Sequence, residues 1–281
     1  MRSLTGQAER IDARARPFER ALFGVLTRYG LAVARRAVVP GALRRMAAVK
    51  DAEGRVVFAK TEEDEDLRRH ILDLLLHYGM AAALDAARNA MREAGVFNPE
   101  RILPERLVAD ALAGKPIRLR IVQTWRDGIY TRAERLTEAT RAMVAESVRG
   151  VLSGARTEVP APSAGELARR LATQFHGKDE EGRDFAFSPT RAELIARTEL
   201  TQAENTGIYS GYKLAGVRMV EWLAYRDGRS GRRHHERMHG VRKRVGAAFV
   251  TPLGNVLSYP GDPTAPIEDT ARCRCTVRAV R

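Results

Sequence analysis

The spacing of apolar residues predicts three long helices in the first half of the chain. Apolar side chains recur there at intervals of three and four residues, so that they share one face of a helix. The stretches with this pattern are 17–40, 61–95 and 116–150. Thr61 precedes an acidic first turn, which suits the positive end of a helix dipole. Residues 1–16 are polar and basic, and we expect either a disordered arm or a frayed helix there.

A fourth helix, from Ser188 to Gly216, has clear signals at both ends. Ser188 is a favourable N-cap, Pro189 suits the first helical position, and Gly216 is typical of a helix C-terminus. One face carries small side chains, which predicts that another backbone approaches it closely. This face consists of Ala196, Leu200, Ala203, Gly207 and Gly211. Another face keeps a polar line at seven-residue spacing, made of Arg191, Thr198, Asn205 and Tyr212.

After this helix the pattern changes to short strands separated by turns. The strand-like segments are 217–226, 248–251, 256–259 and 273–280. The predicted fold class is therefore α+β, with a mostly helical N-terminal half followed by a smaller α+β domain that holds a short antiparallel sheet. Residues 157–165 contain two prolines and small side chains, and are the best linker candidate. We expect domains at 1–155 and 163–281, and a protease-resistant fragment that begins near Ser163.

The charge is concentrated at the two ends of the chain. The net charge is +13, and residues 1–60 hold 13 Lys/Arg against 5 Asp/Glu, while residues 191–281 hold 16 against 9. This distribution indicates either a polyanionic partner, most simply nucleic acid, or a solvated arginine-rich surface. Few aromatic residues lie among the basic ones, so we expect sequence-independent contact with double-stranded DNA. The candidate residues are Arg229, Arg232, Arg233, Arg237, Arg242, Lys243 and Arg244.

The two cysteines lie one residue apart, so they do not form the disulfide framework of a small secreted protein. We therefore expect a reducing compartment. No stretch of eighteen uninterrupted apolar residues occurs, and the most apolar N-terminal run lacks the layout of a signal peptide. These features predict a protein without a membrane partner.

Two motifs suggest metal chemistry. Residues 235–239 match the H-E-x-x-H pattern of zinc proteases, but arginines surround the motif and Gly240 ends any helix, so this function is disfavoured. Cys273 and Cys275 form a structural zinc site if they meet one of the histidines (His234, His235 or His239) and Asp227. In the alternative, one cysteine faces the core and the other faces solvent. No other cofactor is expected.

Taken together, residues from about 165 to 280 resemble the phage head morphogenesis family, the Mu F-like minor head proteins. The resemblance rests on an Ala-Arg-Thr-Glu helix with a later Asn, a Trp-bearing strand, Asp-x-Arg, His, Gly, Pro-Gly and a terminal Cys-Arg-Cys. The corresponding residues are Ala196, Arg197, Thr198, Glu199, Asn205, Trp222, Asp227, Arg229, His235, Gly240, Pro260, Gly261, Cys273, Arg274 and Cys275. Arg272 stands where the family usually has Asn.

The resemblance implies a minor head protein that acts in procapsid assembly near the portal. Such a protein is located in the virion head and is assembled in the cytoplasm of the bacterial host. Its implied partners are the portal or major capsid proteins and packaged DNA. In this interpretation Thr198 and Asn205, with an Arg197–Glu193 pair, are structural and attach their helix to the strand and to the Asp227 loop. The competing class is a nuclease or transferase that uses His235, Glu199 and Asp227 in an open cleft.

Overall fold

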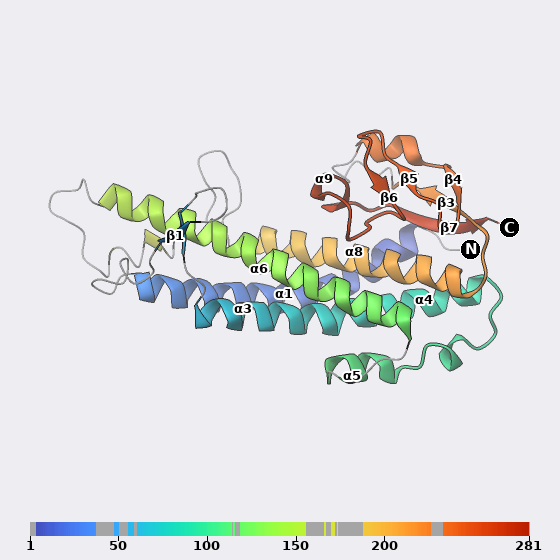
Figure 1. Cartoon of the computed structure of the whole chain (residues 1–281), viewed down its shortest axis with the longest axis horizontal. Coiled ribbons are helices and arrows are strands. Elements are labelled where there is room, and N and C mark those ends of the chain that lie inside the picture. Colours follow the sequence, from blue (N-terminus) through green and yellow to red (C-terminus); the bar gives the residue numbers. More distant parts are fainter. Residues whose placement is uncertain are drawn as a thin grey trace. The chain divides into compact units, whose positions relative to one another are not determined.

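A computed structural model describes residues 4–37, 48–50, 56–58, 61–113, 115, 119–155, 166, 170–171, 173, 188–225 and 233–280. It confirms the predicted fold class, because helices fill the N-terminal half and the C-terminal part holds small antiparallel sheets (Figure 1). No helix within these ranges combines the length and apolar character that a membrane crossing requires.

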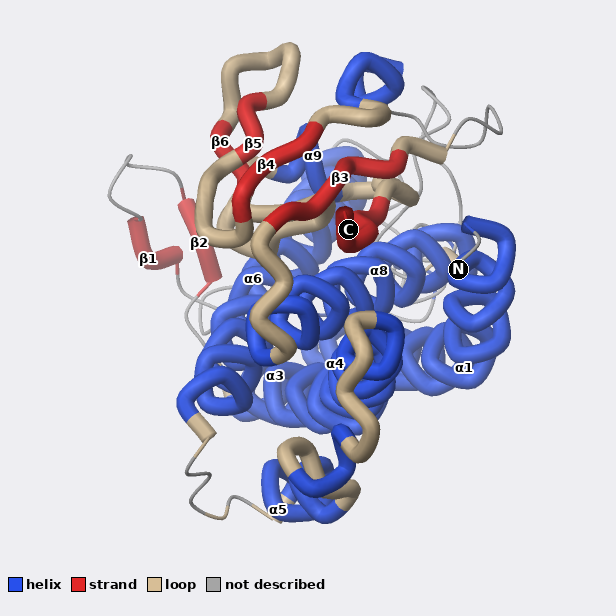
Figure 2. The backbone as a smooth tube through the Cα atoms, turned by 90° about the vertical axis from the view of Figure 1, so that its right-hand side faces the viewer, coloured by secondary structure: helices blue, strands red, loops and turns tan. Residues whose placement is uncertain are grey.

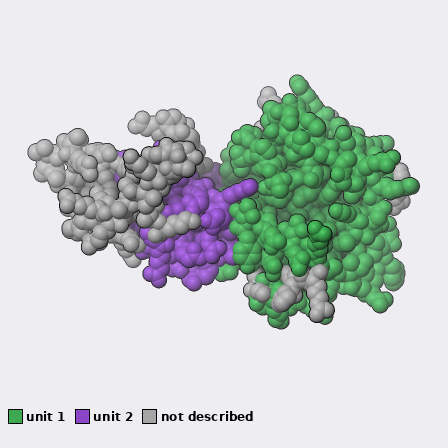
Figure 3. Space-filling model, viewed as in Figure 1, with its two compact units in different colours: residues 1–18, 73–132, 194–281 green, residues 19–72, 133–193 purple. Residues whose placement is uncertain are grey.

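The chain forms two compact units (Figure 3). Unit 1 contains residues 1–18, 73–132 and 194–281, and unit 2 contains residues 19–72 and 133–193. Each boundary falls inside a helix. The four helices concerned are α1 (Leu4–Ala37), α3 (Glu62–Leu74), α6 (Arg120–Ala155) and α8 (Pro189–Leu214). The units therefore differ from the two consecutive domains expected from the sequence. The expected linker lies outside the described residues, so cleavage there stays a prediction.

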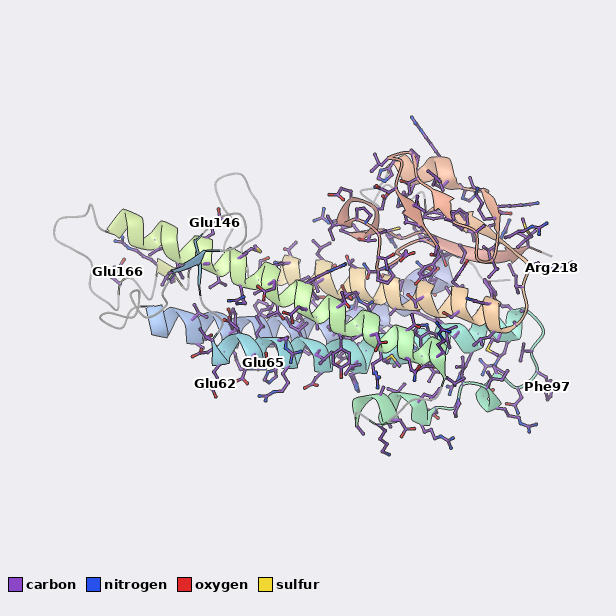
Figure 4. The ribbon with its side chains drawn as sticks, in the orientation of Figure 1. Glu62, Glu65, Phe97, Glu146, Glu166 and Arg218 are labelled. Carbon is purple, nitrogen blue, oxygen red and sulfur yellow. The ribbon has the colours of Figure 1, made fainter. Side chains whose placement is uncertain are left out.

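Unit 2 is held by helices and a small hairpin. The hairpin pairs β1 (Ala48–Lys50) with β2 (Val56–Phe58) in antiparallel fashion. Thr61 caps α3 as expected, because the Asp64 N–H donates to Thr61 Oγ1 (3.3 Å) and the Thr61 N–H donates to Asp64 Oδ2 (2.8 Å). The acidic side chains Glu62 and Glu65 are exposed at the start of α3 (Figure 4).

The buried carboxylate of Asp64 also joins two other helices of unit 2. It accepts a hydrogen bond from the Tyr29 hydroxyl on α1 and pairs with Arg141 Nε on α6 at 3.0 Å. Burial raises the pKa of Tyr29, and the bond to the Asp64 carboxylate raises it further. A buried carboxylate with these partners is satisfied and stabilises the fold.

The first helix begins earlier than the apolar pattern suggests. α1 starts at Leu4 and continues through Pro17, so the expected arm is wrong and the helical alternative holds. The physical reason lies in long-range packing within unit 1. Phe18 stacks on Tyr78 with ring centroids 5.1 Å apart, Arg14 pairs with Asp85, and Gln7 Nε2 donates to Asn205 Oδ1 at 3.4 Å. These contacts stabilise the helical conformation of a segment that is too polar for its hydrophobic periodicity to predict a helix.

The helix expected over 61–95 is continuous but not uniform. A six-residue π-helical segment, η1 (Leu75–Met80), separates α3 from α4 (Ala81–Glu93), and Gly95 ends α4 with φ +96°. A 3₁₀ turn η2 (Pro99–Arg101) and a short helix α5 (Arg106–Leu112) follow, before α6 begins.

The small-residue face of α8 lies against α4, which supplies the close backbone contact that the sequence predicted without identifying the partner. A Cβ atom on Gly207 would lie 2.9 Å from Ala83 Cα, and a Cβ atom on Gly211 would lie 2.9 Å from Ala87 Cα. The two backbones therefore approach too closely for a side chain. The ends of α8 also agree with the expectation, because the Arg191 N–H donates to Ser188 Oγ (3.0 Å) and Gly216 has φ +71°.

The C-terminal strands of unit 1 lie on one side of α8 (Figures 1 and 2). A three-stranded antiparallel sheet has the order β4-β3-β7, where β3 is Met219–Leu223, β4 is Arg242–Arg244 and β7 is Thr276–Val280. A separate hairpin pairs β5 (Phe249–Val250) with β6 (Val256–Leu257). The core between these strands and α8 includes Trp222, which is completely buried, and its cross-strand partner Val277.

Candidate functional site

The polar line of α8 holds the C-terminal Cys-Arg-Cys segment. Thr198 Oγ1 accepts a hydrogen bond from the Arg272 N–H (3.3 Å), and Asn205 Nδ2 donates to the Cys275 carbonyl (2.8 Å). Both side chains are buried, so leaving their partners unpaired would cost about 1–3 kcal/mol each. Their expected structural role agrees with these contacts. The contact that we expected with the Asp227 loop concerns a residue outside the described ranges.

Three metal-ligating side chains meet beside this segment. His235 lies on the 3₁₀ helix η3 (Arg233–Met238), and its Nδ1 atom is 3.5 Å from Cys273 Sγ and 3.8 Å from Cys275 Sγ. The three ligand atoms all lie within 4.8 Å of one another, and all three residues are at most 2% exposed. The alternative in which one cysteine faces solvent is therefore wrong.

A buried carboxylate orients His235 from its other side. His235 Nε2 lies 2.8 Å from Asp269 Oδ1 on the short helix α9 (Ile267–Thr270). Asp269 is completely buried and also contacts His234 Nε2 (3.0 Å) and Asn255 Nδ2 (2.6 Å). Burial alone would raise the pKa of Asp269, but the hydrogen bonds from Asn255 and the two histidines outweigh it and lower this pKa. Sequence reasoning missed Asp269, although it lies only four positions before Cys273.

The environment of the two thiols differs. The hydrogen bond from the Cys273 thiol lowers the pKa of Cys275, and the Trp222 indole and the Tyr225 N–H lower it further. Together these donors outweigh burial, which would raise this pKa. The pKa of Cys273 is raised by its bond to Cys275 and by burial. The indole Nε1 of Trp222 makes no conventional hydrogen bond within the described residues. Its ring lies edge-on to His235, with centroids 5.4 Å apart.

The H-E-x-x-H pattern does not assemble a protease site in the part of the chain that the structure describes. Residues 233–238 form a 3₁₀ helix, so the i, i+4 histidines lose the shared face that an α-helix would give them. His239 Nδ1 instead accepts the Ala224 N–H (3.2 Å), and His239 belongs to neither described cluster of metal-ligating side chains. Glu236 is exposed. His239, expected as a metal candidate, is therefore not brought to the cysteines.

Glu199, the acid of the enzyme alternative, is buried and pairs with Arg132 Nε on α6 at 2.6 Å. Burial raises its pKa, and the Arg132 guanidinium partly opposes this effect. His235 has other partners, namely the cysteines and Asp269. Arg197, from the same turn of α8, pairs with Asp12 on α1.

The expected DNA-binding residues are only partly described. Arg229 and Arg232 lie outside the described ranges, as does the side chain of Arg233. Arg237, Arg242 and Arg244 are exposed and Lys243 is half-buried. Arg242 is not a free charge, because Glu221 in the central strand pairs with both Arg242 Nε (2.9 Å) and Arg278 Nη2 (2.7 Å).

Unit 1 also contains a pocket of about 440 Å³, which sequence reasoning did not anticipate. It is lined by apolar and polar residues of η1, α4, α6 and α8, among them Trp125, Asp127 and Arg132, and by residues of the loop 258–264. Two of its polar groups are already paired, because the Tyr259 hydroxyl bonds Thr206 Oγ1 (3.1 Å) and Arg132 bonds Glu199. Burial, as the main cause, raises the pKa of Tyr259 to about 12.

Comparison of the chain with protein-family models, with curated proteins and with solved structures finds no match.

Proposed function

We propose that this chain is a structural head protein of a phage or prophage, which acts in procapsid assembly near the portal. The observation that carries the proposal is the convergence of the motif residues. Pieces that are scattered between Thr198 and Cys275 in the sequence contact one another in unit 1. Thr198 and Asn205 hold the Cys-Arg-Cys segment, and Trp222 lies against His235.

The two motif glycines fit the same pattern. Gly240 has φ +84°, and its N–H donates to the Trp222 carbonyl at 2.8 Å. Gly261 has φ +69° and lies close to α8, where a Cβ atom would be 3.6 Å from Gln202 Cα. Both positions need a backbone conformation that glycine adopts readily. The motif therefore encodes a way of closing this fold, which supports a structural role.

The enzyme alternative requires His235, Glu199 and Asp227 around one open cleft. His235 and Glu199 are both buried, and each is engaged with different side chains. Asp227 lies outside the described residues. The alternative therefore gains no support from the described geometry, and we do not propose catalysis.

The basic residues support a second part of the proposal, which is sequence-independent contact with packaged DNA. Arg237 and Arg244 are exposed, and neither forms an ion pair with a carboxylate of the described residues. Replacing Arg229, Arg232, Arg233 and Arg237 with Ser should weaken DNA binding and reduce the salt slope by up to about one per lost phosphate contact. The matched control also removes four charges, by replacing the exposed Arg101, Arg106, Arg120 and Arg135 with Ser. An equal slope in both variants would show that the basic run is only a solvated surface.

The head function is tested by deleting the coding sequence from the phage that carries it and examining heads by negative-stain electron microscopy. We expect aberrant or missing procapsids, and the protein should be present in few copies in wild-type heads. Complementation with wild-type protein should restore heads, whereas the Asn205→Ala variant should restore fewer. Normal heads without the protein, together with its absence from purified virions, would overturn the proposal.

A further inference from the structure

The cluster of His235, Cys273 and Cys275 has the dimensions of a tetrahedral metal site. Zinc lies about 2.3 Å from thiolate sulfur and about 2.1 Å from imidazole nitrogen, and tetrahedral angles then separate the ligand atoms by about 3.5–3.8 Å. The observed distances from His235 Nδ1 to the two sulfurs are 3.5 Å and 3.8 Å. The side chains therefore need little rearrangement to share one ion.

The surroundings of the cluster also match those of a metal site. Metal-bound histidines commonly donate their second ring N–H to a carboxylate, which fixes the tautomer and the ring orientation. Asp269 is placed for this role, 2.8 Å from His235 Nε2, which leaves Nδ1 free to face the sulfurs. The Trp222 N–H, which has no other partner in the described part of the chain, and the Tyr225 N–H act on Cys275. Such donors stabilise a thiolate ligand.

We propose that His235 Nδ1 and the thiolates of Cys273 and Cys275 bind one zinc ion, with Asp269 as the positioning residue for His235. Two thiolates and an imidazole favour zinc among the common divalent cations, whereas calcium and magnesium prefer oxygen ligands. These donors leave one tetrahedral position for water or for another side chain. Binding replaces the protons of the two thiols. His234 and His239 are not ligands.

The burial of the ligands makes the site structural. No ligand residue is more than 2% exposed, whereas a catalytic zinc needs a position that substrate can reach. The ion would join η3 to the segment that enters β7, and so would lock the last strand of the sheet onto the loop after β3. This inference does not depend on the proposed head function.

Elemental analysis of the full-length protein, purified from zinc-supplemented cells without chelator, should give one zinc per chain. Reconstitution with Co²⁺ should produce a thiolate-to-cobalt charge-transfer band and the strong visible bands of tetrahedral cobalt. A mercurial reagent should release one zinc as two thiols react. These measurements use the wild-type protein and so do not depend on the folding of any variant.

Variants then locate the site. Cys273→Ser, Cys275→Ser and His235→Asn should each lose most of the zinc, while the control His70→Asn, at an exposed histidine of α3, should keep it. Asp269→Asn should keep the thiolate–cobalt band but bind zinc about 10–100-fold more weakly in chelator competition. Wild-type protein that holds no zinc and gives no cobalt band would overturn the proposal. Stoichiometric iron or copper in place of zinc, or full zinc in the Cys273→Ala/Cys275→Ala protein, would overturn it as well.

Discussion

Arg272 is the one described residue other than glycine with a positive φ, 54°. A residue with a Cβ atom loses of the order of 1 kcal/mol of stability in this left-handed backbone conformation, and Asn tolerates the conformation better than Arg does. The conformation is imposed from both sides, because the Arg272 N–H donates to Thr198 and the next residue enters the cysteine cluster. The Arg272 side chain itself is exposed, so little packing depends on it.

We therefore predict that Arg272→Asn stabilises the protein by about 0.5–1 kcal/mol. The free energy of unfolding, measured by urea titration, checks this. The control is Arg244→Asn, at an exposed strand position without positive φ, which should give no gain. A loss of stability in Arg272→Asn would mean that the arginine side chain contributes more than the strain costs.

The Glu221 carboxylate on β3 forms ion pairs with both neighbouring strands, β4 and β7. The strand register places it opposite Arg242 on β4 and Arg278 on β7. Burial alone would raise its pKa, but the hydrogen bonds from the two arginines outweigh burial and lower it. A lowered pKa in the folded state means that the carboxylate stabilises the fold above its unfolded pKa. This contribution is lost as the pH falls through the folded value.

Glu221→Gln should accordingly destabilise the protein by about 1 kcal/mol at pH 7, a modest amount because the side chains of Arg242 and Arg278 are 59% and 42% exposed. The difference from wild type should shrink as the pH falls below 4.5 and through the folded pKa. Thermal unfolding at several pH values checks this. Glu146→Gln, at an exposed carboxylate of α6, is the control and should change little (Figure 4). A constant difference at all pH values would refute the assignment.

At the scale of elements, the close contact of α8 with α4 makes a helix glycine indispensable. Gly207→Ala should improve helix propensity by about 1 kcal/mol, yet its Cβ would meet the backbone of Ala83. We expect overpacking to dominate and to destabilise the protein by about 2 kcal/mol or more. Gly150→Ala, on α6 where a Cβ meets no atom within 4 Å, should instead stabilise it slightly. Urea titration of both variants checks the contrast, and equal effects would contradict it.

The elements that the sequence predicted are those with local signals. The caps at Ser188, Gly216 and Thr61 depend on neighbouring residues. The glycines of α8 indicate that another backbone packs closely on this helix, but they do not identify which one. The start of α1 was left open between an arm and a helix, because Phe18 and Arg14 find their partners some sixty or more residues away. The π-helical segment η1 was not predicted, because residues 75–80 are compatible with an ordinary α-helix and only the i→i+5 hydrogen bonding distinguishes the two.

The candidate site was predicted in part, for the same reason. His235 and the two cysteines were suspected because their residue types have few other uses in such spacing. The choice of His235 over His234 and His239 depends on how η3 turns, which periodicity does not reveal. Asp269 was missed because a single carboxylate in an acidic turn has no distinguishing pattern. The role of Asp227 stays a prediction, since it lies outside the described residues.

At the scale of the whole molecule, unit 1 is assembled from segments on both sides of the expected linker. We predict that protease cuts between residues 153 and 163 leave a fragment starting near Ser163 that stays bound to the N-terminal fragment. The physical reason is that α8 packs on α4 through Gly207 and Gly211. Denaturing gels should show two fragments, while gel filtration should show one species. Separate elution of two folded fragments would instead favour the independent domains expected from the sequence.

The composition of unit 1 has a consequence for synthesis on the ribosome. Its core needs β7, at residues 276–280, to complete the sheet beside β3 and cover Trp222. Residues 4–18 of the same unit are translated more than two hundred residues before β7, so they lack this part of their unit for most of synthesis. The nascent chain therefore carries uncovered apolar surface for most of its synthesis, and such intermediates aggregate readily. A nascent chain stalled with residues 273–280 still inside the ribosome should bind chaperones much more than one stalled after these residues have emerged.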